Sequence, residues 1–147
     1  MRAQELIRAL GLAPHPEGGH YREVHRSPAA PGARPASTAI YFLLVAGQVS
    51  RWHRVDAEEA WHHYEGGPLE LLWEEGGEVV RAVLGPDRHL AVVPAHAWQA
   101  ARPLGDYALM GCTVAPAFDF RGFQLLADDP AEAARFRARH PRESEGL

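Results

Sequence analysis

Between residues 37 and 126 the sequence alternates short β-rich runs with turn signals, and this pattern limits the folds that the chain can adopt. Thr38–Val45 is rich in β-branched and aromatic residues and ends just before Gly47. Further runs follow at Val49–Val55, Ala60–Tyr64, Pro68–Trp73, Glu78–Leu84, Leu90–Val93, Trp98–Arg102, Tyr107–Val114 and Gly122–Leu126. Glycine and proline separate these runs, and no helical pattern lies between them. Short strands at a spacing of about 8–12 residues predict an antiparallel sandwich or barrel.

Helical patterns occur only near the two ends of the chain. Residues 2–10 carry apolar side chains on one stripe, Gly11 can end this helix, and Pro14 prevents it from restarting. A second helix is expected from Pro130 to about Arg139, capped by Asp128 or Asp129. With 147 residues and no linker or repeat, the chain is expected to form one all-β domain, residues 1–147, with short N- and C-terminal helices.

Composition narrows the classes of function. The net charge of −4 shows no basic bias, so we expect no nucleic-acid or membrane partner. The N-terminus has no uninterrupted apolar segment, and the natural expectation is a cytoplasmic protein. The single cysteine, Cys112, excludes an intramolecular disulfide, and in an apolar strand it is expected to be a packing residue. The sequence contains no lysine, which excludes Schiff-base and P-loop chemistry.

The segment Arg51–Gly66 concentrates histidine and glutamate residues. Imidazole and carboxylate groups bind transition metals and also act as acids and bases, and His53 and Glu59 could point into a barrel from neighbouring strands. The alternative is that these side chains pack as half-buried strand residues. Strand alternation directs one of His62 and His63 inward and the other outward. The other histidines lie in turn, terminal or loop contexts, where we expect exposed or locally hydrogen-bonded rings: His15, His20, His25, His89, His96 and His140.

Several of these segments resemble the cupin superfamily. The spacing of His53, Glu59 and Gly66 resembles the first cupin motif, and residues 92–99 resemble the second. More specifically, five segments in order along the chain resemble the fifth cupin group, a family catalogued as a domain of unknown function: residues 14–21, 37–44, 52–55, 59–62 and 111–120. The resemblance implies a cupin double-stranded β-helix, a jelly-roll-like antiparallel barrel that is commonly a homodimer. It is also similar in shape to deoxysugar-nucleotide epimerases (RmlC-like) and germin-like metal enzymes.

The sequence departs from the metal-binding cupin pattern at two positions. Arg51 replaces the first histidine of the His-x-His pair, and Gln99 stands at the histidine position of the second motif. Of the usual set of three histidines and one glutamate, only His53 and Glu59 remain, so no tightly bound metal and no other cofactor is expected. A metal held by His53 and Glu59, with His62 or His63 completing the set, is the alternative.

The resulting expectation is a ligand pocket inside the barrel. His53 and Glu59 are the catalytic candidates. The candidates for ligand binding, to which Trp61 or Tyr41 would contribute part of the wall, are Tyr41, Trp61, His62, His63, Gln99 and Asp119. A tyrosine could serve as the acid in such a site, and the candidates for that role are Tyr41, Tyr64 and Tyr107.

Three functional hypotheses follow. The first is a cupin that binds a small polar ligand, such as a sugar or nucleotide sugar, and acts as an isomerase or epimerase without metal. The second is a metal-dependent cupin enzyme, either a dioxygenase or an isomerase. The third is a non-catalytic small-molecule binding module.

Overall fold

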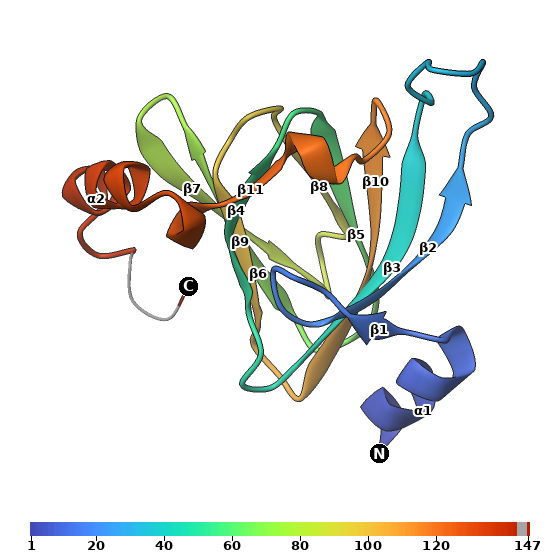
Figure 1. Cartoon of the computed structure of the whole chain (residues 1–147). Helices are drawn as coiled ribbons and strands as arrows, with labels where there is room; N and C mark the ends of the chain where they lie inside the picture. Colours follow the sequence, from blue (N-terminus) through green and yellow to red (C-terminus); the bar gives the residue numbers. More distant parts are fainter. Residues whose placement is uncertain (144–146) are drawn as a thin grey trace.

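The computed structural model describes residues 1–143 and residue 147, and it contains a barrel of two sheets with one α-helix near each end of the chain (Figure 1). The first half of the chain comprises α1 (Arg2–Leu10), β1 (Ala13–Pro14), β2 (His20–Arg26), β3 (Thr38–Val45), β4 (Ser50–Val55) and β5 (Glu58–Gly66). The second half comprises β6 (Leu69–Glu75), β7 (Glu78–Leu84), β8 (Leu90–Val93), β9 (Gln99–Pro103), β10 (Tyr107–Ala115), β11 (Phe123–Leu125) and α2 (Pro130–Arg139). Two short 3-10 turns, Phe120–Gly122 and Leu126–Asp128, flank β11.

The strands form two antiparallel sheets that face one another. One sheet has the order β1-β2-β3-β10-β5-β8 and the other has the order β11-β4-β9-β6-β7. β10 lies between β3 and β5, strands that are distant from it in sequence. The architecture confirms the predicted jelly-roll-like antiparallel barrel with short terminal helices. The expected hairpin around Glu74–Gly77 is also present, as β6 paired with β7.

The helix ends follow the local signals in the sequence. Gly11 adopts φ 64° and ψ 46° at the end of α1, a left-handed conformation that glycine accepts without a Cβ penalty. Asp129 begins α2 by accepting a hydrogen bond of 3.0 Å from the amide of Glu132, and Pro130 occupies the first turn. Near β11 the outcome differs from expectation. Asp119 caps the turn Phe120–Gly122, and β11 is shorter than the predicted strand.

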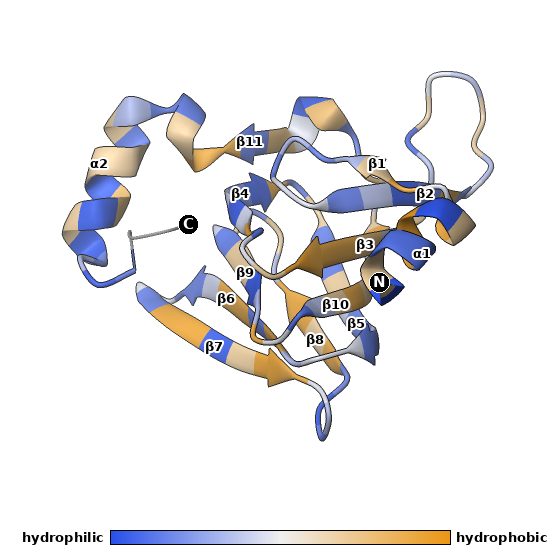
Figure 2. Cartoon of the chain, turned by 90° about the horizontal axis from the view of Figure 1, so that it is seen from below, coloured by the Kyte–Doolittle hydropathy of each residue, from blue (hydrophilic) through white to orange (hydrophobic). Residues whose placement is uncertain are grey.

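Apolar side chains fill one end of the barrel and also attach both helices. Residues from both sheets meet in the interior, among them Phe42, Trp61, Leu71, Leu84 and Met110. α2 packs through Ala133 and Phe136 on a cluster that includes Trp52, Leu72 and Trp98, and α1 packs through Ala3 and Leu6 against Leu43 and Leu109. Figure 2 shows long apolar stretches in β3 and β7, whereas β2 and β4 carry more polar residues.

The other end of the barrel interior is polar. Glu17, His53, Glu59 and Gln99 are buried there, with exposed fractions of 5%, 1%, 7% and 1%. Burying such groups is unfavourable unless they are paired, so the partners of these four side chains determine what this end of the barrel can do. Within the part of the chain that the structure describes, no helix is long and apolar enough to span a membrane.

Candidate functional site

The loop between β1 and β2 enters the open end of the barrel. The amide of Arg51 in β4 donates a hydrogen bond of 2.8 Å to the carbonyl oxygen of Glu17. Gly18 has φ +116°, and a Cβ at this position would lie 2.0 Å from the carbonyl oxygen of Val49. Gly19 has φ +76°, and a Cβ there would lie 2.8 Å from the carbonyl oxygen of Leu43. Only glycine fits at these two positions, and this close approach carries the side chains of His15 and Glu17 into the barrel.

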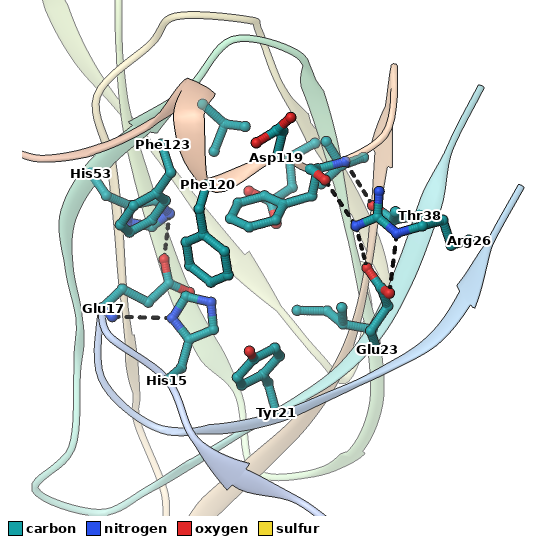
Figure 3. Close-up of a pocket in the computed structure, with 15 residues that line it drawn as sticks. His15, Glu17, Tyr21, Glu23, Arg26, Thr38, His53, Asp119, Phe120 and Phe123 are labelled. Carbon is teal, nitrogen blue, oxygen red and sulfur yellow. Dashed lines mark hydrogen bonds and ion pairs between the residues drawn. The ribbon is translucent and has the colours of Figure 1, made fainter. Parts of the chain in front are cut away.

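A cavity of about 420 Å³ occupies this end of the barrel (Figure 3). Its walls combine charged and aromatic side chains from β2, β4, β5, the entering loop and the segment after β10. The polar lining consists of His15, Glu17, Tyr21, Glu23, Arg26, Thr38, His53, Glu59 and Asp119. The apolar lining consists of Ile40, Val55, Val114, Phe118, Phe120 and Phe123. A cavity of this size and mixed lining suits a small polar organic molecule.

His53 and Glu17 form a buried pair that shares one proton. His53 Nε2 lies 2.6 Å from Glu17 Oε2, and both side chains are almost inaccessible to solvent. The other ring nitrogen, Nδ1, lies 2.7 Å from the carbonyl oxygen of Arg51. A carbonyl oxygen only accepts, so Nδ1 carries a proton, and a second proton must lie between Nε2 and the carboxyl group.

The charge state of this pair follows from its environment. Burial lowers the pKa of His53, but the charge and hydrogen bond of Glu17 outweigh it, and the pKa is raised. Burial raises the pKa of Glu17, yet the charge and hydrogen bond of His53 produce a net lowering. The pair is therefore an imidazolium and a carboxylate at neutral pH.

Glu59 is a second buried carboxyl group with a different protonation behaviour. Burial and the neighbouring charge of Glu17 raise its pKa from the usual 4.5 to about 7. Gln99 Nε2 donates a hydrogen bond of 2.9 Å to Glu59 Oε1, and Gln99 Oε1 accepts one of 2.9 Å from the indole nitrogen of Trp61. Because an indole N–H can only donate, Trp61 orients the Gln99 amide so that its NH₂ group faces Glu59. Glu59 is therefore held in one orientation and changes protonation near neutral pH.

The structure brings three of the predicted site residues to the cavity. His53, Glu59 and Asp119 line it. Gln99 lies in the barrel interior, where its amide contacts Glu59, and Trp61 lies behind Gln99 with no exposed surface. These two residues support Glu59 and are not among the residues that form the cavity wall. Asp119 is bound by Arg121, whose guanidinium holds the pKa of Asp119 at about 2.

The remaining predicted site residues lie away from the cavity. Tyr41 lies on the outer surface of its sheet in a groove beside α1, with its ring edge toward Tyr64. His62 stacks on Tyr64, which is 57% exposed, and so faces outward. His63 follows the inward alternation of Glu59 and Trp61, but at the far end of β5, where its Nε2 lies 2.8 Å from the carbonyl oxygen of Gly67. Strand alternation predicted the opposite directions of the two histidines, whereas their distance from the cavity depends on the length of β5.

The expected tyrosine acids are also outside the cavity. Tyr41 and Tyr64 belong to the outer surface, and Tyr107 donates a hydrogen bond of 2.6 Å to Glu65, which also binds Arg2 of α1. The tyrosine that lines the cavity is Tyr21, at the start of β2. Cys112 is buried in the core as predicted.

Sequence reasoning missed five cavity residues that precede β3: His15, Glu17, Tyr21, Glu23 and Arg26. The first three belong to residues 14–21, a segment that resembles the fifth cupin group and in which His15 is expected to be exposed or locally hydrogen-bonded. The signal that could have identified them is the pair Gly18-Gly19 directly after a histidine and a glutamate. Adjacent glycines permit a close backbone approach, which is needed where a loop enters a barrel.

The donor set at this site does not fit a tightly bound metal ion. Both ring nitrogens of His53 are engaged, by Glu17 and by the Arg51 carbonyl, and the Gln99 amide is committed to Glu59 and Trp61. Arg51 points away, with its guanidinium on the carbonyl oxygen of Pro16. Among residues 1–143 and 147, no group of three or more His, Cys, Asp or Glu side chains is arranged to hold a metal.

Comparison with known proteins identifies relatives along nearly the whole chain. Residues 4–126 match the model of the family described as Cupin superfamily (DUF985). A structure of a protein from Shewanella oneidensis shares 33% identity and superposes with a TM-score of 0.86, covering 97% of this chain and 92% of that one. A hypothetical protein from Leishmania major shares 28% identity, with a TM-score of 0.81 and coverage of 97% and 94%.

More distant structures share the fold alone. Oxalate decarboxylase from Bacillus subtilis is 20% identical, with a TM-score of 0.65, and the match covers 84% of this chain and 33% of that one. A search of the curated proteins found no match.

Proposed function

Because the chain belongs to the cupin superfamily, in the family described as DUF985, we propose that its barrel binds a small polar organic molecule and moves a proton on it by metal-free general acid–base catalysis, as an isomerase or epimerase does. The observation that carries this proposal is the set of three titratable side chains in one wall of the cavity. Glu17 and His53 form an ion pair that shares a proton, and Glu59 has a pKa of about 7.

The cavity supports a ligand of limited size and mixed polarity. Its volume of about 420 Å³ lies in the range of small-molecule sites. Phe118, Phe120 and Phe123 offer apolar contact area, and Figure 3 shows Phe123 beside His53 and Phe120 beside His15, so apolar and polar groups are mixed around the cavity. A sugar-sized molecule with a hydrophobic face and several oxygen atoms matches this mixture of apolar and polar groups.

Glu59 is suited to act as the base. A base whose pKa lies near the working pH is ionised in a large fraction of the molecules and still binds a proton strongly, and this combination favours proton transfer. With a pKa of about 7, Glu59 is present in both protonation states around neutral pH. His53 contributes an imidazolium that can hold positive charge beside the reacting group, and Glu17 keeps it protonated.

The proposal is tested first by ligand binding. A panel of aldoses, ketoses, aldonic acids and nucleotide sugars is screened by thermal shift and by ligand-observed NMR. The same screen is run on the variant Glu59→Gln. Its control is Glu58→Gln, which changes an exposed neighbour on the same strand. At least one panel member should stabilise the wild-type protein. Binders are then incubated with the protein in D₂O, and deuterium should enter a carbon-bound position.

The outcomes separate the competing functions. Loss of deuterium incorporation in E59Q, with retention in the Glu58→Gln control, is the expected result. Ligand binding without any deuterium incorporation would show that the protein is a non-catalytic binding module. Elemental analysis of protein purified without chelators completes the test, because near-stoichiometric transition metal that is required for exchange would overturn the metal-free mechanism in favour of a metal-dependent enzyme.

A further inference from the structure

His15 faces the cavity, and neither the proposed base nor the ion pair includes it. Its side chain is 5% exposed, so it is more than nine-tenths buried. It reaches the cavity from the loop before β2, and Figure 3 shows its ring between Phe120 and Tyr21. A buried imidazole with an open edge toward a cavity needs a hydrogen-bond partner there.

The backbone determines which nitrogen of His15 carries the proton. The amide of Glu17 donates a hydrogen bond of 3.0 Å to His15 Nδ1. An N–H group can only donate, so Nδ1 must hold a lone pair, and the proton of the neutral ring is on Nε2. Protonating Nδ1 would break this bond. Burial and the positive charge of His53 also lower the pKa of His15, against the attraction of Glu17.

Aromatic side chains hold the ring in place. The ring of Tyr21 meets it edge-on at a centroid distance of 4.5 Å, and three further rings surround it at 5.7–6.4 Å: Phe42, Phe120 and Phe123. Rotation of the imidazole would disrupt both this packing and the hydrogen bond from Glu17. Among the described residues Nε2 has no hydrogen-bond partner, so its N–H group is free to meet a ligand.

We propose that His15 is a catalytic residue whose neutral Nε2–H group donates a hydrogen bond to a carbonyl oxygen of the substrate, which makes the substrate a small carbonyl compound with a hydrogen on the adjacent carbon. This inference rests on the proposed function and adds the class of substrate to it. Glu59, whose carboxylate would remove the proton, and His15, whose imidazole would donate the hydrogen bond to the carbonyl oxygen, line the same cavity.

The Glu59 carboxylate takes the hydrogen from the carbon next to the carbonyl as a proton. The electron pair of that C–H bond forms the C=C bond of an enolate, and the carbonyl electrons move to oxygen, where the negative charge is stabilised by the hydrogen bond from His15. Return of the proton from Glu59 to the same carbon regenerates the substrate. When that carbon also carries a hydroxyl group, the intermediate is an enediolate: its hydroxyl proton passes to the former carbonyl oxygen, Glu59 returns its proton to the former carbonyl carbon, and the former hydroxyl oxygen becomes the new carbonyl oxygen. His15 keeps its own proton throughout. A donor aimed at a developing oxyanion contributes about 100- to 1,000-fold to the rate.

The test compares two substitutions that differ in one donor. His15→Gln keeps an N–H group near the position of Nε2. His15→Asn keeps an oxygen that can accept from the Glu17 amide but places no donor at the Nε2 position. His25→Asn makes the same change at an exposed residue of β2 and serves as the control. The probes are glycolohydroxamate, a planar mimic of an enediolate, and erythritol, a polyol without a carbonyl group.

Wild-type protein, H15Q and H25N should bind glycolohydroxamate with similar affinity. H15N should bind it about 10- to 100-fold more weakly, while its erythritol affinity is unchanged. Nitrogen-15 NMR of the histidine rings should show unprotonated Nδ1 and protonated Nε2 for His15 at neutral pH, with the Nε2–H proton shifting downfield when glycolohydroxamate binds.

Two results overturn the proposal in distinguishable ways. If wild-type protein binds both probes and H15N binds glycolohydroxamate as tightly as the wild type, the assignment of His15 is wrong and the proposed function stands. If wild-type protein binds neither these probes nor any member of the panel at millimolar concentration, the proposed function fails and this inference fails with it.

Discussion

Replacing Glu59 with glutamine should stabilise the protein at alkaline pH and leave its stability nearly unchanged in acid. Glutamine has the shape of the protonated side chain, and its oxygen can still accept the hydrogen bond from Gln99. In the folded protein the pKa of Glu59 rises from 4.5 to about 7, because burial and Glu17 disfavour the charged form. The difference between these two pKa values corresponds to about 3 kcal/mol.

The pH window follows from the direction of this shift. Below the unfolded pKa, Glu59 is protonated in both states and contributes nothing to the pH dependence. Between the unfolded and folded pKa values the folded state binds the extra proton, so the free energy of unfolding decreases as pH rises. Above the folded pKa of about 7 the full penalty of about 3 kcal/mol is present in the wild type and absent in E59Q.

The assay is urea denaturation of wild type and E59Q at about pH 5 and about pH 8.5, followed by the fluorescence of the tryptophans. The stability difference between variant and wild type should grow by about 3 kcal/mol in favour of E59Q between the two pH values. Glu58→Gln is the matched control, since Glu58 is exposed on the same strand, and its difference should be independent of pH. A difference for E59Q that stays constant within about 0.5 kcal/mol would show that Glu59 is ionised without penalty and refute the reasoning.

Further predictions concern the supporting structure and the assembly. Replacing His53 with alanine leaves the Glu17 carboxylate buried without its partner, and unfolding experiments should show a loss of about 3–5 kcal/mol. A loss below about 1 kcal/mol would mean that water replaces the imidazole at no cost. Gly18→Ala should destabilise the protein by at least about 2 kcal/mol and weaken ligand binding, because its Cβ would meet the carbonyl oxygen of Val49 at 2.0 Å. Gly47→Ala is the control, because Gly47 also has a positive φ, +87°, but a Cβ there would meet no atom within 4 Å. A loss of stability in G47A as large as that in G18A would contradict the steric argument. Finally, we propose that the protein forms a homodimer through its open sheet edges, and sedimentation should give about twice 16.2 kDa; a monomer at tens of micromolar would refute this.

The strand pattern could be predicted from the sequence because it depends on local physics. Turn residues separate the β-rich runs, and the connections between most of the runs are too short for the helical crossovers that parallel strands need. The helix ends at Gly11 and Asp129 were predictable for the same reason, since capping involves residues within one turn of each other. His53 and Glu59 could be nominated because their spacing resembles the first cupin motif. The structure places them on β4 and β5, which belong to facing sheets and not to neighbouring strands of one sheet.

The site required information that no local pattern contains. Tyr41 and Tyr64 are strand residues like those in the cavity wall, yet the barrel turns them outward. His62 and His63 belong to the same strand as Glu59, but only three-dimensional distance shows that neither reaches the cavity. The alternation along a strand predicts which face of the sheet a side chain points from, but it does not predict which residues of other strands lie opposite that side chain.

The order of strands and turns in the sequence is enough to predict an antiparallel barrel with terminal helices, and the cupin resemblance adds the expectation of a histidine and a glutamate inside it. The tertiary structure alone decided that the loop before β2 enters the barrel and brings Glu17 to 2.6 Å from His53. That contact joins residues far apart in the chain, and it depends on the absence of side chains at Gly18 and Gly19 against backbone that only the folded barrel provides. The protonation of His53, Glu59 and His15 depends on this arrangement, because burial and neighbouring charge exist only once the chain has folded.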